Sequence, residues 1–577
     1  MKNAVLGVVF IWAMVCWGAY SFGINEVPPY HTDENYYVES VTHMVESGDY
    51  LTPYYHGKKR FSKPIFTYWL MAISYKLFGP GLASARFWSA FLGAGCSILT
   101  FLLAQRLFGT KPAFISSLIL PGIFIHFMVA RWATTDMILN FFILATFYFF
   151  IRGYQEDSVS SKNYLLAYTS LSLGFLTKGP PAFLIPFLVI SSFLVLSGQR
   201  EKLFRLKFFS GIAILLAINL PWFGGMWLVH GQEFLDHLIN IEINNRLSDP
   251  TPIGFYYFWS LFRYLLPWSF FFFTAVLVYF GLVAWQGDKK TEKTFLKNIK
   301  TQFLKLFDPE SQSLLFCFLG VGIPLFLFFS LGIQHSRYLL PVFPFVCAIL
   351  GVFFVQIETY GNWRNWYFFK IPFLLSIIFY ILIAVGMVVL MVLYKKMEPI
   401  PFRLGIVPFT LAFGISLLTF LFFYKKIFGI VVTLALMQII TLTFIFGDAL
   451  PFYSRYPMNK FKEISTMPLK KDATLAVFGL GNDRAKLSIL TGKPVYGFED
   501  PQKLLINLNL KKIALIAMKE NDWKQKFADI NFVLIQRDVK WKWEGSFWIA
   551  LASLFEKAIK DRMEDLTETV VLLKYEK

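Results

Sequence analysis

The sequence predicts an α-helical, polytopic membrane protein with about thirteen transmembrane helices and a small C-terminal α/β domain. Of its 577 residues, 56% are hydrophobic, 19% aromatic and only 16% charged, whereas soluble domains average about 25% charged residues. The apolar residues gather in long runs such as 314–333 and 371–394, and about 20 apolar residues are enough to cross the hydrocarbon core of a bilayer. From residue 449 onward the runs become shorter and strand-like.

The apolar runs place the expected spans along the chain, and polar loops separate them. The thirteen expected spans lie near 4–24, 84–107, 112–130, 134–152, 163–177, 180–197, 208–229, 255–284, 314–333, 338–357, 369–394, 404–424 and 427–448. We therefore divide the chain into a transmembrane domain, 1–448, and a C-terminal domain, 449–577.

Loop charge predicts the orientation of these spans. The formal net charge is +18, and two loops between apolar runs, 198–207 and 287–307, are strongly basic. Because Lys and Arg are enriched in cytoplasmic loops, these two loops and the N-terminus are expected in the cytoplasm. Residues 25–83 then form a large outer loop, and the C-terminal domain is periplasmic. The basic charge indicates membrane lipids as partners, not nucleic acid.

Histidines and cysteines give weaker signals. All seven histidines fall in expected outer loops or near outer helix ends, which favours chemistry on that face, although imidazoles also suit the polar interface. Outer histidines and carboxylates permit a divalent metal, but no ligand spacing such as H-x-x-x-H is present, and no other cofactor is indicated. The four cysteines lie inside apolar runs and are interpreted as small buried hydrophobic residues.

Two adjacent carboxylates, Asp33 and Glu34, stand near the start of the first outer loop. Val38 and Val41 follow on one helical face, which predicts an amphipathic helix lying on the membrane surface; a second is expected over residues 65–77. Acidic residues suit the first turn of a helix, where they meet unpaired N–H groups. Carboxylates at a membrane surface are also candidates for a catalytic base, and both interpretations stay open here.

Four cations follow in the same loop: Lys58, Lys59, Arg60 and Lys63. The positive-inside rule disfavours cations on the outer side, although long loops tolerate them. Since Arg binds phosphate through two N–H groups and Lys binds it as a point charge, this cluster is a candidate site for a lipid-linked phosphate.

The tail alternates strand-like and helix-like segments, which predicts a small α/β domain. Strands are expected near 473–480, 512–518 and 531–536, with helices near 484–490, 501–508 and 521–528. The sequence GLGNDRA after the first strand is similar to a dinucleotide-binding fingerprint, but Arg484 holds the third glycine position, so a tight turn is the better interpretation.

Motifs along nearly the whole chain resemble the bacterial lipid A aminoarabinose transferases, within the wider protein O-mannosyltransferase-like group of C-type membrane glycosyltransferases. The first outer loop carries Asp33, Glu34, Tyr37, Gly48, Asp49, Pro53, Lys63, Pro64, Tyr68, Trp69, Leu77, Phe78 and Gly79 in the order of that family. Later matches are ARWATTDM (130–137), FLTKGP (175–180), LLPW (265–268), RYLLPVFP (337–344) and LSILTGKPV (487–495).

The resemblance implies an inverting transfer of a sugar from a polyprenyl-phosphate donor to a lipid or protein acceptor of the cell envelope, lipid A or lipopolysaccharide included, at the outer face of the inner membrane. It implies that Asp33 is the catalytic carboxylate, that Glu34 supports it or contacts the acceptor or a metal, and that Asp136 is a second carboxylate. The resemblance assigns the donor phosphate to Lys63, Arg60 and Arg131, and further substrate contacts to Tyr37, Lys178 and Arg337.

Three departures from the family pattern leave the sugar and the acceptor open. Tyr36 stands where the family usually has Arg, and Ser62 stands where an acidic residue usually precedes Lys-Pro. The outer loop before the eighth span, EINNRLSDPTPIGFYY (242–257), lacks the expected His. Simpler roles also remain: Asp136 as a helix cap, Lys178 as an interfacial cation and Arg337 as a partner of lipid headgroups. Rival functions are a transporter or flippase of lipid-linked saccharides, another membrane transferase such as a protein O-glycosyltransferase, and a membrane scaffold.

Overall fold

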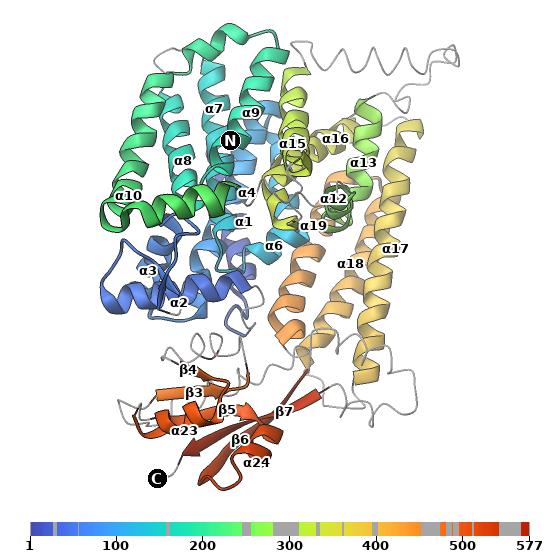
Figure 1. The fold of residues 1–577 in the computed structure, drawn as a ribbon. Helices are drawn as coiled ribbons and strands as arrows, with labels where there is room; N and C mark the ends of the chain where they lie inside the picture. Colours follow the sequence, from blue (N-terminus) through green and yellow to red (C-terminus); the bar gives the residue numbers. More distant parts are fainter. Residues whose placement is uncertain are drawn as a thin grey trace.

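The structure is a computed structural model. It describes residues 2–26, 32–55, 57–156, 162–244, 255–280, 311–330, 335–359, 363–394, 402–451, 474–480, 487, 495–510, 513–541 and 567–575. Most of these residues belong to a bundle of long helices, and the last of them form a separate sheet (Figure 1). The basic loop 287–307 and the turn after Leu480 lie outside the described residues.

The helical part begins with a long helix and a short helical and hairpin segment. Its first half comprises α1 (Lys2–Ser21), α2 (Thr32–Ser47), β1 (Tyr54–Tyr55), β2 (Lys58–Lys59), α3 (Phe66–Phe78), α4 (Leu82–Phe108), α5 (Thr110–Ile119), η1 (Leu120–Gly122), α6 (Phe124–Val129), α7 (Thr135–Glu156), α8 (Lys162–Lys178), α9 (Pro181–Leu196), η2 (Arg200–Arg205), α10 (Phe208–Asp236) and η3 (His237–Asn244). Its second half comprises α12 (Tyr256–Leu265), α13 (Trp268–Tyr279), α15 (Gln312–Ser330), η5 (Ser336–Val342), α16 (Phe343–Thr359), α17 (Trp363–Tyr394), η6 (Phe402–Gly405), α18 (Ile406–Phe423), α19 (Ile427–Phe444) and η7 (Ile445–Ala449).

These helices make the protein a multi-pass membrane protein. Within the described residues, eight helices are long and apolar enough to cross a bilayer, and ten if two bent pairs each count as one crossing. Every one of the thirteen runs expected from the sequence coincides with at least one described helix. The number thirteen stays a prediction, because the apolar part of α1 (Val5–Ser21) and α9 are short for a full crossing, as is α8 with 17 residues.

Two expected spans are bent, which the hydrophobic pattern did not reveal. The run 255–284, expected as one span, contains two helices, α12 and α13, at 118° to each other. Leu266 between them has extended backbone, with φ −51° and ψ 137°, because the ring of Pro267 disfavours helical backbone in the preceding residue. The run 112–130 bends by 65° between η1 and α6.

The first outer loop folds against the bundle. As expected, two helices form here, and α2 begins one residue before Asp33. Their packing differs from the expectation: Val38, Val41 and Met44 are buried in a protein core with Tyr68 and other side chains of α3, α8 and α10. The apolar face of α2 is therefore covered by protein and does not lie on lipid. Figure 1 shows α2 and α3 at one end of the long helices.

The C-terminal sheet has five strands in the order β4-β3-β5-β7-β6. Its elements are β3 (Thr474–Phe478), β4 (Val495–Phe498), α23 (Pro501–Leu510), β5 (Ile513–Lys519), α24 (Glu520–Lys526), β6 (Phe532–Trp541) and β7 (Thr567–Tyr575). β3 pairs in parallel with β4 and β5, and β7 pairs antiparallel with β5 and β6. The α/β fold was predicted, but β4 and β7 were missed. The sheet lies beyond the same end of the bundle as α2 and α3 (Figure 1).

Candidate active site

Four charged side chains from distant parts of the chain meet near this end of the bundle. Arg337 of η5 donates from Nη1 to Oδ2 of Asp33 in α2 at 2.8 Å, and its Nε lies 3.6 Å from Oδ2 of Asp136 in α7. Lys178, the last residue of α8, donates to the other carboxylate oxygen of Asp136. The charges of two carboxylates and two cations thus cancel within one network. Four of the site residues proposed from the sequence come together here.

Burial separates the two carboxylates of this network. The side chains of Asp136 and Lys178 are 4% and 6% exposed, whereas Asp33 is 30% exposed. Arg337 joins them and is 11% exposed. Asp136 and Lys178 are buried and paired with each other, so their side chains are held in place and form the floor of the site. Asp33 is the carboxylate that a substrate can reach.

An aromatic ring and an imidazole complete this side of the site. The ring of Tyr338 lies under the Lys178 ammonium at 4.5 Å, a cation–π contact. His335 lies at the exposed edge, beside Arg337 in the chain. Partial desolvation of its ring and the nearby cations Arg337 and Lys178 lower the pKa of His335 below its ordinary value. His335 is therefore neutral at neutral pH.

Arg60 approaches Asp33 from the cationic segment of the first outer loop. Its guanidinium stacks on the ring of Tyr36 at 4.2 Å, and its Nε donates to the hydroxyl of Tyr68 at 3.3 Å. Burial opposes the charge of Arg60, but Tyr68 and the other negative or hydroxyl groups nearby, Asp33 among them, raise its pKa overall. Lys63 is half-buried and donates to the carbonyl of Ser62 at 2.8 Å.

Tyr37 is 3% exposed and packs against Tyr68, with ring centroids 5.2 Å apart. Burial raises the pKa of its hydroxyl, so the ring stays neutral. The buried position of Tyr37 fits a wall of the site and not a side chain that contacts substrate from an exposed surface.

Glu34 lies in a different environment from Asp33. Its side chain is fully buried and takes two hydrogen bonds of 2.8 Å from Arg86 of α4, which is also buried. The backbone N–H of Ala133 donates to the same carboxylate at 2.7 Å. This clamp ties α2 to the turn that leads to Asp136. The structure thus gives Glu34 internal partners, whereas the resemblance implied that Glu34 supports Asp33 or contacts the acceptor or a metal.

Arg131 also has internal partners, all of them carbonyl oxygens. Its Nη1 donates to the carbonyls of Tyr20 and Phe22 at 2.7 and 2.6 Å, at the end of α1. Its Nη2 donates to the carbonyl of Phe446 at 3.3 Å. The guanidinium therefore caps the negative ends of two helices. Within the described residues Arg131 makes no ion pair with Asp33 or Asp136.

Arg86 is the residue that sequence reasoning missed. It lies five residues into α4, a 27-residue apolar helix. An ionisable residue at such a place is costly unless it is paired, and this cost is the signal that could have marked it. Its partner could not be read from the sequence, because Glu34 is 52 residues away.

His335 borders this site, but other described histidines lie elsewhere. His126 is fully buried beside the hydroxyl of Tyr20, and His230 and His237 pack around Phe61. Within the described ranges, no group of three or more His, Cys, Asp or Glu side chains could hold a metal ion. His31 and His56 lie outside the described residues.

Three comparisons identify relatives of the chain. The family described as dolichyl-phosphate-mannose-protein mannosyltransferase matches residues 62–224. The undecaprenyl phosphate-alpha-4-amino-4-deoxy-L-arabinose arabinosyl transferase of Edwardsiella ictaluri is 30% identical over 245 residues, which cover 41% of this chain and 44% of that protein. The protein of the same name from Photorhabdus laumondii is 26% identical over 469 residues, 78% of each chain. The chain spans about half the length, or less, of the curated relatives it matches first.

A solved structure shares the whole fold. The crystal structure of ArnT from Cupriavidus metallidurans bound to undecaprenyl phosphate superposes with a TM-score of 0.71, covers 99% of this chain and 98% of that chain, and is 17% identical. The apolar helices and these relatives indicate a multi-pass protein of the inner membrane. Residues 62–224 thus match the protein mannosyltransferase family, and over most of its length the chain is similar to the aminoarabinose transferases.

Proposed function

We propose that the protein is an inverting glycosyltransferase. It moves a sugar from a polyprenyl-phosphate donor to lipid A, lipopolysaccharide or another acceptor of the cell envelope, at the outer face of the inner membrane. The observation that carries the proposal is the charge network in which Asp33, 30% exposed, is the most accessible group beside Asp136, Lys178 and Arg337. The relatives named as arabinosyl transferases support it.

Asp33 is the general base in this proposal. It takes the proton of an acceptor hydroxyl while the hydroxyl oxygen forms a bond to the anomeric carbon of the sugar. The bond between that carbon and the phosphate oxygen breaks on the opposite face, so the configuration inverts. The polyprenyl phosphate leaves with the electron pair of the broken bond, and its additional negative charge needs stabilisation.

Cations beside Asp33 provide that stabilisation. Arg337 contacts Asp33 directly, and Arg60 lies close enough for the Asp33 charge to raise its pKa. Lys63 follows Arg60 in the same half-buried segment. Fixed cations aimed at a leaving phosphate act without reorganisation, which is the main source of rate in such sites. Lys178 is held by Asp136 and fixes the position of that carboxylate.

A transporter of lipid-linked saccharides is the alternative. Such proteins place their binding site near mid-membrane, between broken helices of repeated halves. Here Asp33 and Asp136 begin helices, Lys178 ends one, and all meet at one end of the bundle. This arrangement favours surface chemistry. The bent pair α12 and α13 is the feature that a transporter would share.

We keep the division into a transmembrane domain, 1–448, and a periplasmic domain, 449–577, with the N-terminus in the cytoplasm. In this orientation α2, α3 and the sheet lie on the outer side. The sugar and the acceptor stay open, since Tyr36 and Ser62 depart from the family pattern beside the site.

Asp33→Asn tests the function. Sugar release from synthetic polyprenyl-phosphate sugars, with lipid A and other envelope acceptors supplied, should fall on the order of 100-fold or more, because general-base catalysis typically contributes that much. Asp236→Asn is the matched control, since Asp236 is exposed at the end of α10 and its change should leave turnover unaltered. Equal turnover of Asp33→Asn and wild type, with both folded, would remove Asp33 from the mechanism.

A further inference from the structure

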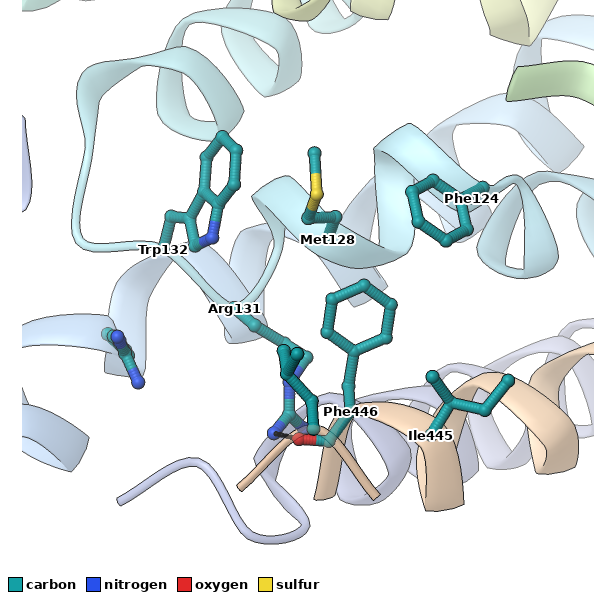
Figure 2. Close-up of a pocket in the computed structure, with 8 residues that line it drawn as sticks. Phe124, Met128, Arg131, Trp132, Ile445 and Phe446 are labelled. Carbon is teal, nitrogen blue, oxygen red and sulfur yellow. Dashed lines mark hydrogen bonds between the residues drawn. The ribbon is translucent and has the colours of Figure 1, made fainter. Parts of the chain in front are cut away.

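A cavity of about 210 Å³ lies beside the Glu34–Arg86 clamp and the capping Arg131, and Asp33 is not among its lining residues. Its walls are Phe124 and Met128 of α6, Trp132 of the following turn, Ile445 and Phe446 of η7, and Leu450 just after η7; Arg86 and Arg131 also line it. Figure 2 shows the guanidinium of Arg131 beside the carbonyl of Phe446 and below the rings of Phe124 and Trp132. The lining is mainly hydrocarbon, so water alone fills such a space poorly.

The two arginines of the cavity differ in how their charge is balanced. Arg86 is neutralised by Glu34 through two hydrogen bonds. Arg131 is 3% exposed, and among the described residues its acceptors are carbonyl oxygens alone. Burial and the neighbouring Arg86 lower the pKa of Arg131 to about 9. Helix-end carbonyls supply only partial charges, and no carboxylate among the described residues accepts a hydrogen bond from Arg131.

The position of Arg131 gives the level of the cavity relative to a membrane. Arg131 follows α6 and precedes α7, and it contacts carbonyls at the end of α1 and in η7, which continues α19. Helices that cross a bilayer end at the headgroup level. A cation held at these ends therefore stands where lipid phosphates are, and apolar side chains of α6 and η7 lie beside it.

We propose that this cavity binds the phosphate group of a membrane lipid, as a second lipid-phosphate site apart from the Asp33 network. The phosphate contacts Arg131, whose Nε–H has no acceptor among the described residues, and guanidinium suits phosphate geometrically. The first part of the hydrocarbon chain packs against Phe124, Met128 and Ile445. The bound lipid supplies the missing negative charge. The inference does not depend on the transfer reaction.

The test measures lipid binding to the purified full-length protein by native mass spectrometry and by the shift of its melting temperature. The probes are short-chain phosphatidylglycerol, farnesyl phosphate, farnesol and inorganic phosphate. We expect either or both phosphate lipids to bind at least 10-fold more tightly than farnesol or inorganic phosphate. The preferred probe shows whether the lipid is a phospholipid or a polyprenyl phosphate.

Variants assign that binding to the cavity. Ile445→Trp fills the cavity without removing a hydrogen bond and should weaken phosphate-lipid binding at least 10-fold; Arg131→Lys keeps the charge and should weaken it less. Leu436→Trp, on the exposed face of α19, is the matched control. Arg337→Gln should retain the binding, since it alters the other site.

Three results would overturn the proposal. One is unchanged binding in a folded Ile445→Trp protein. Another is loss of binding in Arg337→Gln alone, which would assign the lipid to the Asp33 network. The third is equal protection by inorganic phosphate or by farnesol, because neither has both the charge and the chain that the cavity requires.

Discussion

At the scale of single residues, Asp33 and Glu34 are neighbours in the chain with opposite surroundings. Asp33 is partly exposed beside Arg337, whereas Glu34 is buried and held by Arg86 and Ala133. The sequence could show that an acidic pair starts a helix, but it could not say which carboxylate faces the site. That choice depends on the rotation of α2, which its packing against α3 and α4 sets.

Removing the Glu34 carboxylate should destabilise the protein. Glu34→Ala leaves Arg86 buried without its counter-ion, which typically costs about 3–5 kcal/mol. Glu46→Ala, on the exposed face of the same helix, should change stability little. Thermal unfolding of both purified variants in the same detergent measures the difference. Equal melting temperatures would mean that the clamp does not stabilise the fold.

The lowered pKa of His335 predicts a pH dependence of donor binding. His335 is neutral above its ordinary pKa of about 6.5, and it gains a proton only as the pH falls through a still lower value. The added positive charge beside Arg337 should then tighten binding of the anionic donor. Titration of a polyprenyl-phosphate sugar between pH 8 and pH 5 should show this, and His335→Gln should abolish it. Tightening that persists in His335→Gln would assign the proton to another group.

At the scale of elements, hydrophobic runs predicted the helices well, because about 20 apolar residues have few alternatives to a membrane helix. Local breaks were harder to predict. Pro267 separates α12 from α13, while Pro221, Pro324 and Pro372 lie inside helices that continue. A proline marks a possible bend, and packing decides whether the helix stops.

Gly231 marks a second break, near the end of α10. Its φ of +54° and ψ of −131° interrupt the helix and direct Phe234 toward Phe61 and Trp222. Ala disfavours positive φ by roughly 1–2 kcal/mol, so Gly231→Ala should lower the melting temperature. Gly224→Ala, on the regular part of the same helix with 3.8 Å to its nearest neighbour, should be neutral or stabilising. The prediction fails if both substitutions have the same effect.

At the scale of the whole molecule, the charge of the loops predicted an orientation that the fold alone does not test. The sheet and the helices α2 and α3 lie at one end of the bundle (Figure 1). The predicted topology places the first outer loop and the C-terminal domain in the periplasm, so it requires them to lie at the same end. The convergence of Asp33, Asp136, Lys178 and Arg337 came from the family resemblance. No periodicity in one sequence brings together residues that lie 304 positions apart.

Labelling of single cysteines tests the orientation. The four native cysteines are buried, so background labelling should be low. In intact spheroplasts a membrane-impermeant maleimide should label Lys524→Cys on the sheet, where the lysine side chain is 63% exposed. It should reach Phe204→Cys, which is 93% exposed in η2, only after permeabilisation. The reverse pattern would invert the topology.

The network of Asp33, Asp136, Lys178 and Arg337 also has a consequence for biosynthesis. A ribosome delivers these residues in chain order, so Asp136 and Lys178 can pair while Arg337 has not yet been made. Until Arg337 is synthesised, Asp33 lacks the cation that links it to the buried pair of Asp136 and Lys178. The charge constellation is complete only after most of the helices have been inserted, so a truncated chain that ends before η5 cannot assemble it.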